Sequence, residues 1–218
     1  MSELGSFNIA MIAAQIIALL IAIIGHEIMH GAAAYAFGDT TAKDEGRLSV
    51  NPIKHIDPIG TIALPLLLLV SGSGFLFGWA KPVPIDTRRV LERGGNKAMV
   101  VVSLAGVAYN LALACLAAWA LRALFAPTDE VNFLSCLLLS LLMWNVILAF
   151  FNLLPIPPLD GANAVAFAAA GIGFYGVARA FNRVGMYGFI ILMLILMTDL
   201  KIPLLAAMKA VIDFMLGV

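Results

Sequence analysis

The sequence is poor in charged side chains, which make up only 12% of its 218 residues, whereas 62% are hydrophobic. A soluble domain carries about 25% charged residues, because water-solvated groups must cover its surface. The composition therefore excludes an ordinary soluble enzyme and a disordered chain. The 13 basic residues cancel the 13 acidic ones, so the chain has no net charge to attract a polyanion, and no nucleic-acid partner is expected.

Cysteines, N-terminal basic residues and repeats are also scarce or missing. The only two cysteines, Cys115 and Cys136, lie inside apolar stretches, which favours small buried side chains over a disulfide or a metal pair. Residues 1–7 contain no basic residue, and the apolar run behind them is too long for the core of a cleavable signal peptide. Without a repeat or a low-complexity linker, a single domain over residues 1–218 is the simplest organisation.

The chain is instead rich in long apolar runs, and a helix that crosses a bilayer needs about 20 apolar residues. A polar segment near residues 40–58 contains a strand-like run at 47–50. The sequence predicts an all-α polytopic membrane protein with about five to six membrane-embedded helices and this small strand or loop segment. The helices are expected over about residues 7–37, 98–125, 133–153 and 185–198, with a further spanning or interfacial helix over 203–218.

One further apolar run, at residues 59–80, is interrupted by Pro65 and by a Ser-Gly cluster at 71–74. Basic residues gather on the two loops that flank it, 38–57 and 81–97, and basic loops favour the cytoplasmic side of a cell membrane. A complete crossing would place these loops on opposite sides. We therefore predict a re-entrant element, whose irregular backbone must pack against protein or a wet cavity, and an N-terminus outside the plasma or inner membrane.

The first apolar run contains the motif H-E-x-x-H at residues 26–30. Residues four apart share one face of a helix, so His26 and His30 can bind one Zn²⁺, and Glu27 can act as the general base for a water molecule. A charge at the bilayer centre costs about 2.5–3.5 kcal/mol, which makes such residues functional candidates. The alternative is that the motif is merely the polar cytoplasmic end of the helix.

A catalytic zinc site takes three protein ligands, and the third is expected to be Asp160. This residue follows the proline-rich end of the fourth apolar run, and Gly161 lets the backbone turn close to the site. The two predicted helices between the motif and Asp160 bring the chain back to the same side of the membrane, provided that 59–80 is re-entrant. The alternative role for Asp160 is a helix N-cap, which is compatible with metal ligation.

These residues resemble the site-2 protease family of intramembrane zinc metalloproteases. Residues 152–161 match the family signature N-x-x-P-x-P-x-x-D-G, and residues 51–61 and 78–84 are similar to its compact prokaryotic branch. The resemblance implies one zinc ion per chain, bound by His26, His30 and Asp160. It also implies that Glu27 activates water and that Asn152 is a catalytic residue near the substrate carbonyl.

Two further residues are secondary candidates. Asn110 ends the sequence at 105–110, which resembles the family element A-G-P-x-x-N with Val107 in place of proline. Its alternative role is a hydrogen bond between helices, which buried asparagines often make in membranes. His55 is either an additional ligand or a polar residue at the cytoplasmic interface beside Asp57, and the second interpretation is favoured.

The resemblance implies hydrolysis of a peptide bond within or near a transmembrane segment of a membrane-protein substrate, with the active site toward the cytoplasmic side. The lipid bilayer and a transmembrane protein or peptide are then the expected partners. Two other classes stay open: a metal-binding transporter or sensor, and a non-catalytic scaffold that binds transmembrane helices. The lack of a repeat disfavours a transporter, and the complete set of ligands with Glu27 between them favours hydrolysis.

Overall fold

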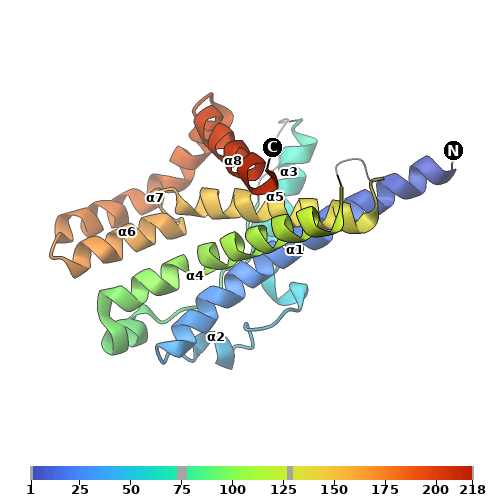
Figure 1. Ribbon diagram of the computed structural model, residues 1–218. Helices are drawn as coiled ribbons and strands as arrows, with labels where there is room; N and C mark the ends of the chain where they lie inside the picture. Colours follow the sequence, from blue (N-terminus) through green and yellow to red (C-terminus); the bar gives the residue numbers. More distant parts are fainter. Residues whose placement is uncertain (1, 73–77, 127–129, 218) are drawn as a thin grey trace.

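The computed structural model describes residues 2–72, 78–126 and 130–217 (Figure 1). Three long helices lie side by side at its centre, and two further helices extend from the end of this bundle before the last helix packs back on it. No strand occurs among the described residues, so the all-α class is confirmed. The central helices are α1 (Ser2–Ala36), α4 (Thr87–Leu124) and α5 (Phe133–Leu153), followed by α6 (Asp160–Gly171), α7 (Tyr175–Met197) and α8 (Lys201–Leu216).

The three central helices are long and apolar enough to cross a membrane, with the apolar part of α1 at Ile9–Ala36. A fourth crossing is possible if α7, which is bent by 73° between Tyr175–Gly185 and Tyr187–Met197, counts as one span. This pattern is that of a polytopic membrane protein with three to four complete crossings. One shorter apolar helix, Pro58–Val70, lies within the run that the sequence predicts to be re-entrant.

Helix ends follow local signals. Asn132 and Ser135 form a reciprocal capping box at the start of α5, and this helix ends at Leu153, as predicted, two residues before Pro155. The prediction for α4 was wrong by several residues at its start. The Asp86 side chain accepts hydrogen bonds from the Arg88 and Arg89 amides, so the helix begins at Thr87, inside the expected loop. The turn expected at 126–130 falls largely on 127–129, outside the described residues.

The core between the central helices is built from small side chains. Ala18 of α1 packs with Ala114, Ala117 and Ala118 of α4 and with Leu142 of α5 in one buried cluster. Small residues allow helix backbones to approach closely, which is the usual source of helix packing in a bilayer. Close packing at this level holds α1, α4 and α5 in a fixed relation, and these three helices carry most of the residues of the candidate site.

The segment between α1 and α4 is mostly loop. It contains the short helices α2 (Thr41–Asp44), η1 (Pro52–His55), η2 (Pro58–Ala63) and α3 (Leu64–Val70). The strand-like run predicted at 47–50 is irregular. No other segment among the described residues pairs with it to form a β-ladder.

The predicted re-entrant element starts and ends in the same place. The Trp79 amide donates to the Gly60 carbonyl at 3.1 Å, and the Lys81 amide donates to the His55 carbonyl at 2.9 Å. Gly60 permits this approach, because a Cβ there would lie 2.3 Å from the Trp79 ring. The chain thus returns to its entry point, as a re-entrant element requires. Part of the predicted Ser-Gly cluster, residues 73 and 74, lies outside the described residues.

Candidate metal centre

Three side chains from two distant parts of the chain converge on one point. The Nε2 atoms of His26 and His30 are 3.0 Å apart, and they lie 3.1 and 3.2 Å, respectively, from Oδ2 of Asp160. Both histidines are 6% exposed, and this is the one group of three or more potential ligands found among the described residues. The two segments that the sequence analysis paired on one metal ion are therefore adjacent in space.

Local structure explains how Asp160 reaches the histidines. It is the first residue of α6, and its carboxylate makes no capping hydrogen bond, so the N-cap interpretation does not describe the structure. The side chain is free to point at α1 instead. Gly161 behaves as expected, since a Cβ there would lie 2.3 Å from the Leu153 carbonyl oxygen at the end of α5. The start of α6 is thus held against the end of α5.

Each histidine ring is oriented by a hydrogen bond on its far side. His26 Nδ1 donates to the Asn110 side-chain oxygen at 2.6 Å, and His30 Nδ1 donates to the Val102 carbonyl at 2.7 Å. The Asn110 amide nitrogen in turn donates to the Ala22 carbonyl and to the Asn145 side-chain oxygen. These partners fix the orientation of the Asn110 amide, and therefore the tautomer of His26.

The donor set fits a metal ion such as zinc. With a hydrogen on each Nδ1, the neutral histidines present lone pairs on Nε2, and Asp160 Oδ2 is a buried atom that accepts no hydrogen bond. When all three groups are unprotonated, these electron-pair donors repel one another, and a cation placed between them would relieve that repulsion. Ligands about 2.0–2.1 Å from a tetrahedral zinc ion are about 3.3 Å apart, slightly more than the observed separations.

The sequence analysis missed two supports of this cluster, Gly106 and Asn145. A Cβ at Gly106 would lie 2.5 Å from His30 Nε2 and 2.6 Å from His26 Nδ1, so only glycine leaves room for both rings. Asn145 is fully buried on α5 and bonds Asn110. Gly106 is part of the family-like element at 105–110, and this match was a sequence signal that could have identified it. Asn145, a polar residue inside an apolar run, offered another.

Glu27 lies beside the cluster and is partly buried. Its Oε2 accepts a hydrogen bond from the Val83 backbone amide at 2.8 Å. No hydrogen bond joins the other carboxylate oxygen, Oε1, to any residue that the structure describes. The carboxylate is therefore oriented through one oxygen, and the other has no hydrogen-bond partner among the described residues.

The remaining candidates lie outside the cluster. The Asn152 amide donates to the Leu148 carbonyl of its own helix at 3.0 Å. His55 is buried under the loop, where its Nε2 donates to the Ser49 carbonyl at 2.8 Å, and it belongs to no ligand group among the described residues. The two cysteines form no disulfide, and Cys136 is buried as predicted, but Cys115 is exposed because it lies on an outward face of α4.

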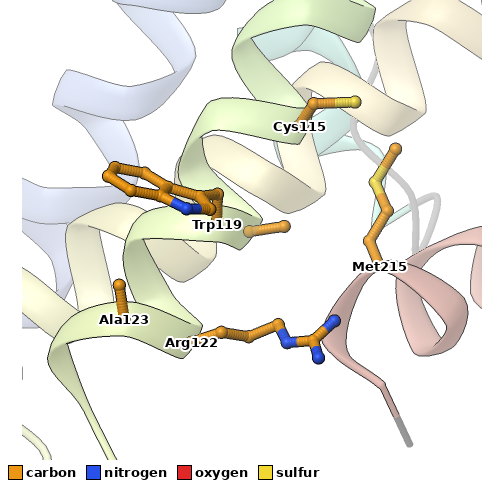
Figure 2. Close-up of a pocket in the computed structure, with 6 residues that line it drawn as sticks. Cys115, Trp119, Arg122, Ala123 and Met215 are labelled. Carbon is orange, nitrogen blue, oxygen red and sulfur yellow. The ribbon is translucent and has the colours of Figure 1, made fainter.

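A cavity of about 420 Å³ lies elsewhere, between the C-terminal part of α4 and α8 (Figure 2). Figure 2 shows Trp119 and Arg122 on α4 and Met215 on α8 around it. None of the three cluster residues lines this cavity, so it is separate from the candidate site.

Comparison with known proteins gives matches of one kind. The chain is 39% identical over 190 residues to "Putative zinc metalloprotease YwhC" of Bacillus subtilis, a match that covers 85% of this chain and 80% of the relative. It is 36% identical over 141 residues to "Putative zinc metalloprotease Rip2" of Mycolicibacterium smegmatis, over 64% of this chain and 51% of the relative. The protein of that name in Mycobacterium tuberculosis is 34% identical over 146 residues, or 67% and 53% of the two chains.

The chain thus spans most of YwhC and about half the length of the Rip2 proteins. No family model matches the sequence, and no solved structure matches it. The relationship to YwhC extends over most of both chains, and the motifs at residues 26–30 and 152–161 are those of one family. The chain belongs to the site-2 protease family of zinc metalloproteases.

Proposed function

We propose that this protein is an intramembrane zinc metalloprotease that hydrolyses a peptide bond within or near a transmembrane segment of a membrane-protein substrate. One observation carries the proposal: the Nε2 atoms of two histidines and an oxygen of Asp160 converge within 3.0–3.2 Å of one another, inside an apolar helix bundle beside a carboxylate. A single domain over residues 1–218 performs the reaction. Both relatives carry the name "Putative zinc metalloprotease", which supports the same chemistry.

His26, His30 and Asp160 would hold the metal. Zinc, when bound, supplies Lewis-acid activation of water and of the scissile carbonyl. Glu27 accepts the proton of the attacking water on its free oxygen and returns it to the leaving amine. Asn110 keeps the His26 ring in one tautomer through the bond from Nδ1. Asn152 has a second amide hydrogen with which to bond the substrate carbonyl.

The distribution of basic residues supports an orientation. The segments 38–57 and 81–97, which flank the re-entrant element and include the start of α4, carry a large share of the lysines and arginines, so they face the cytoplasm of a plasma or inner membrane. The H-E-x-x-H motif lies near the end of α1 that leads into the first of these segments, which places the site toward the cytoplasmic side and the N-terminus outside. A substrate helix in the same bilayer reaches the site laterally.

Removal of the metal separates this function from its alternatives. We expect the purified chain in lipid nanodiscs to cleave a doubly labelled transmembrane peptide, to stop when a chelator removes zinc, and to recover when about one zinc per chain is added back. Peptide cleavage followed by fluorescence measures this. A transporter or sensor would instead move or bind metal in liposomes without cleavage. A scaffold would bind the peptide equally well before and after chelation.

Gly106→Ala is expected to weaken zinc binding and cleavage by about 10–100-fold, the range seen when groups that support metal ligands are disturbed. The added methyl group would enter the space of both histidine rings. Gly176→Ala is the matched control, because a Cβ at that helical position meets nothing within 4 Å. Zinc titration and cleavage assays measure both variants. Equal zinc affinity in the two would show that Gly106 does not shape the ligand site.

A further inference from the structure

The chain from Lys81 to Asp86 runs without regular secondary structure past the base of the candidate site, and it holds Glu27 at one atom. Val83 is 6% exposed and packs toward Gly31, where an added Cβ would lie 2.9 Å from a Val83 methyl group. From this position its amide donates to Glu27 Oε2. The bond joins residues 56 positions apart in the sequence, so it depends on how the whole segment is placed.

Two prolines flank Val83 and limit what the segment can do. Pro82 and Pro84 have no amide hydrogen, so Val83 provides the one N–H donor of the three residues. Proline also fixes its own φ and keeps the preceding residue extended. The unfolded chain at residues 82–84 therefore has little freedom to lose, and the Val83 amide is presented to Glu27 at low entropic cost.

Both ends of the segment are anchored from the loop that follows α1. The Arg47 guanidinium donates to the Lys81 carbonyl at 2.7 Å, and the Asp86 amide donates to Asp39 Oδ2 at 2.7 Å. Asp39 is fully buried, and burial alone would raise its pKa. The hydrogen bonds from Thr41 and Asp86 and the nearby charge of Arg89 outweigh that effect and lower the pKa of this carboxyl.

Arg47 is an unusual anchor. It is 5% exposed, its Nε has no hydrogen-bond partner, and no carboxylate of the described residues pairs with it. A buried unpaired guanidinium costs several kcal/mol, so the residue is a poor choice for stability alone. Its hydrogen bond instead lies two residues from the donor that orients Glu27.

We propose that the Lys81–Asp86 segment positions the general base, with the Val83 amide as the contact and Arg47 as a positioning residue that acts through the Lys81 carbonyl. This inference rests on the proposed function. The Val83 bond occupies Oε2 of Glu27 and leaves Oε1 to take the proton of water. Loss of the bond would let the carboxylate rotate away, which lowers kcat and leaves substrate binding and the three metal ligands unaffected.

The test compares Val83→Pro, which removes the amide hydrogen, with Val83→Ala, which keeps it and loses the same packing. We expect kcat in the nanodisc cleavage assay to fall about 10–100-fold in Val83→Pro relative to Val83→Ala. KM and zinc content should be equal in the two variants. Equal kcat values in two folded variants would overturn the proposal.

A second pair tests Arg47 and keeps the proposal falsifiable if Val83→Pro fails to fold. Arg47→Met should lower kcat by a similar factor without lowering the melting temperature, because an apolar side chain replaces an unpaired buried charge. Arg47→Lys, which keeps a donor for the Lys81 carbonyl, should recover part of the loss. A merely structural role predicts the opposite: a lower melting temperature and less bound zinc, in proportion to the lost activity.

The double variant Arg47→Met/Val83→Pro completes the test. Both changes act on one hydrogen bond, so its kcat should equal that of Val83→Pro, whereas independent effects would multiply. Multiplied effects would overturn the proposal. Glu27→Gln, assayed in parallel, separates the two levels of inference. Wild-type cleavage by that variant would overturn the proposed function and this inference together. Loss of cleavage there, with no effect of Val83→Pro, would overturn only this inference.

Discussion

Glu27→Gln is expected to lower the rate of peptide cleavage by about 10²–10⁴-fold, the usual contribution of a general base. The amide has nearly the shape of the carboxylate, and it can still accept the hydrogen bond from the Val83 amide. It cannot take a proton from water. Because Glu27 is not among the three converging ligands, zinc should stay bound at the wild-type level. Single-turnover cleavage of a labelled transmembrane peptide and metal analysis of the same sample measure the two quantities.

Glu45→Gln is the matched control, because this substitution removes the same charge from the chain. Glu45 is exposed in the loop after α2. The control should cleave at the wild-type rate. Wild-type cleavage by Glu27→Gln would show that another group activates the water, and the assignment of Glu27 would be wrong. Loss of zinc from this variant would show instead that Glu27 supports the ligand set.

Asp160→Asn is expected to remove both zinc and activity. The free energy of binding zinc in protein sites is about 10–16 kcal/mol, and an even share among four ligands is about 2.5–4 kcal/mol, which corresponds to about 10²–10³-fold in affinity. Asparagine keeps the volume of the side chain and removes the charge that a cation needs. In the wild-type chain, a bound cation would compensate the burial of Asp160 Oδ2, which accepts no hydrogen bond in the structure. The neutral amide of asparagine would bind that cation more weakly.

Competition with a zinc-binding dye measures the affinity of this variant, and the cleavage assay at saturating zinc measures what remains of the activity. Asp199→Asn provides the control, because Asp199 is exposed between α7 and α8. Unchanged zinc affinity in Asp160→Asn would remove this residue from the ligand set. The two histidines would then need another third partner, and His55 would have to move to become one.

The sequence predicts a helix well where the helical residues are also apolar enough to contact lipid. The helix at 133–153 was predicted at both ends, because a short turn and a proline-rich segment bound an uninterrupted apolar run. The start of α4 was not, because its first turns are polar and hydropathy detects apolar surface rather than helix. The cap at Asp86 was a local signal of that start. Gly95, with a φ of 62°, bends the helix where its polar and apolar parts meet.

The candidate site was likewise predictable only in part. Ionisable side chains in apolar surroundings are conspicuous, so the sequence analysis singled out the residues that the structure brings together at the cluster. It could not find the Val102 carbonyl or the Val83 amide, because every residue has these groups and only the fold selects which ones matter. Gly106 contributes by lacking a side chain, and such a role becomes visible only when the neighbouring rings are in place.

The sequence separation of the ligands also has a consequence for biosynthesis. Two come from α1 and the third from the start of α6, and helices α4 and α5 lie between them in the chain. A growing chain that has delivered only its first helix to the membrane holds the histidines and the base but no third ligand. On the proposed assignment, every partly synthesised form that lacks α6 lacks a complete metal site. The ligand set is completed only when α6 docks, so completion of the fold would itself complete the metal site.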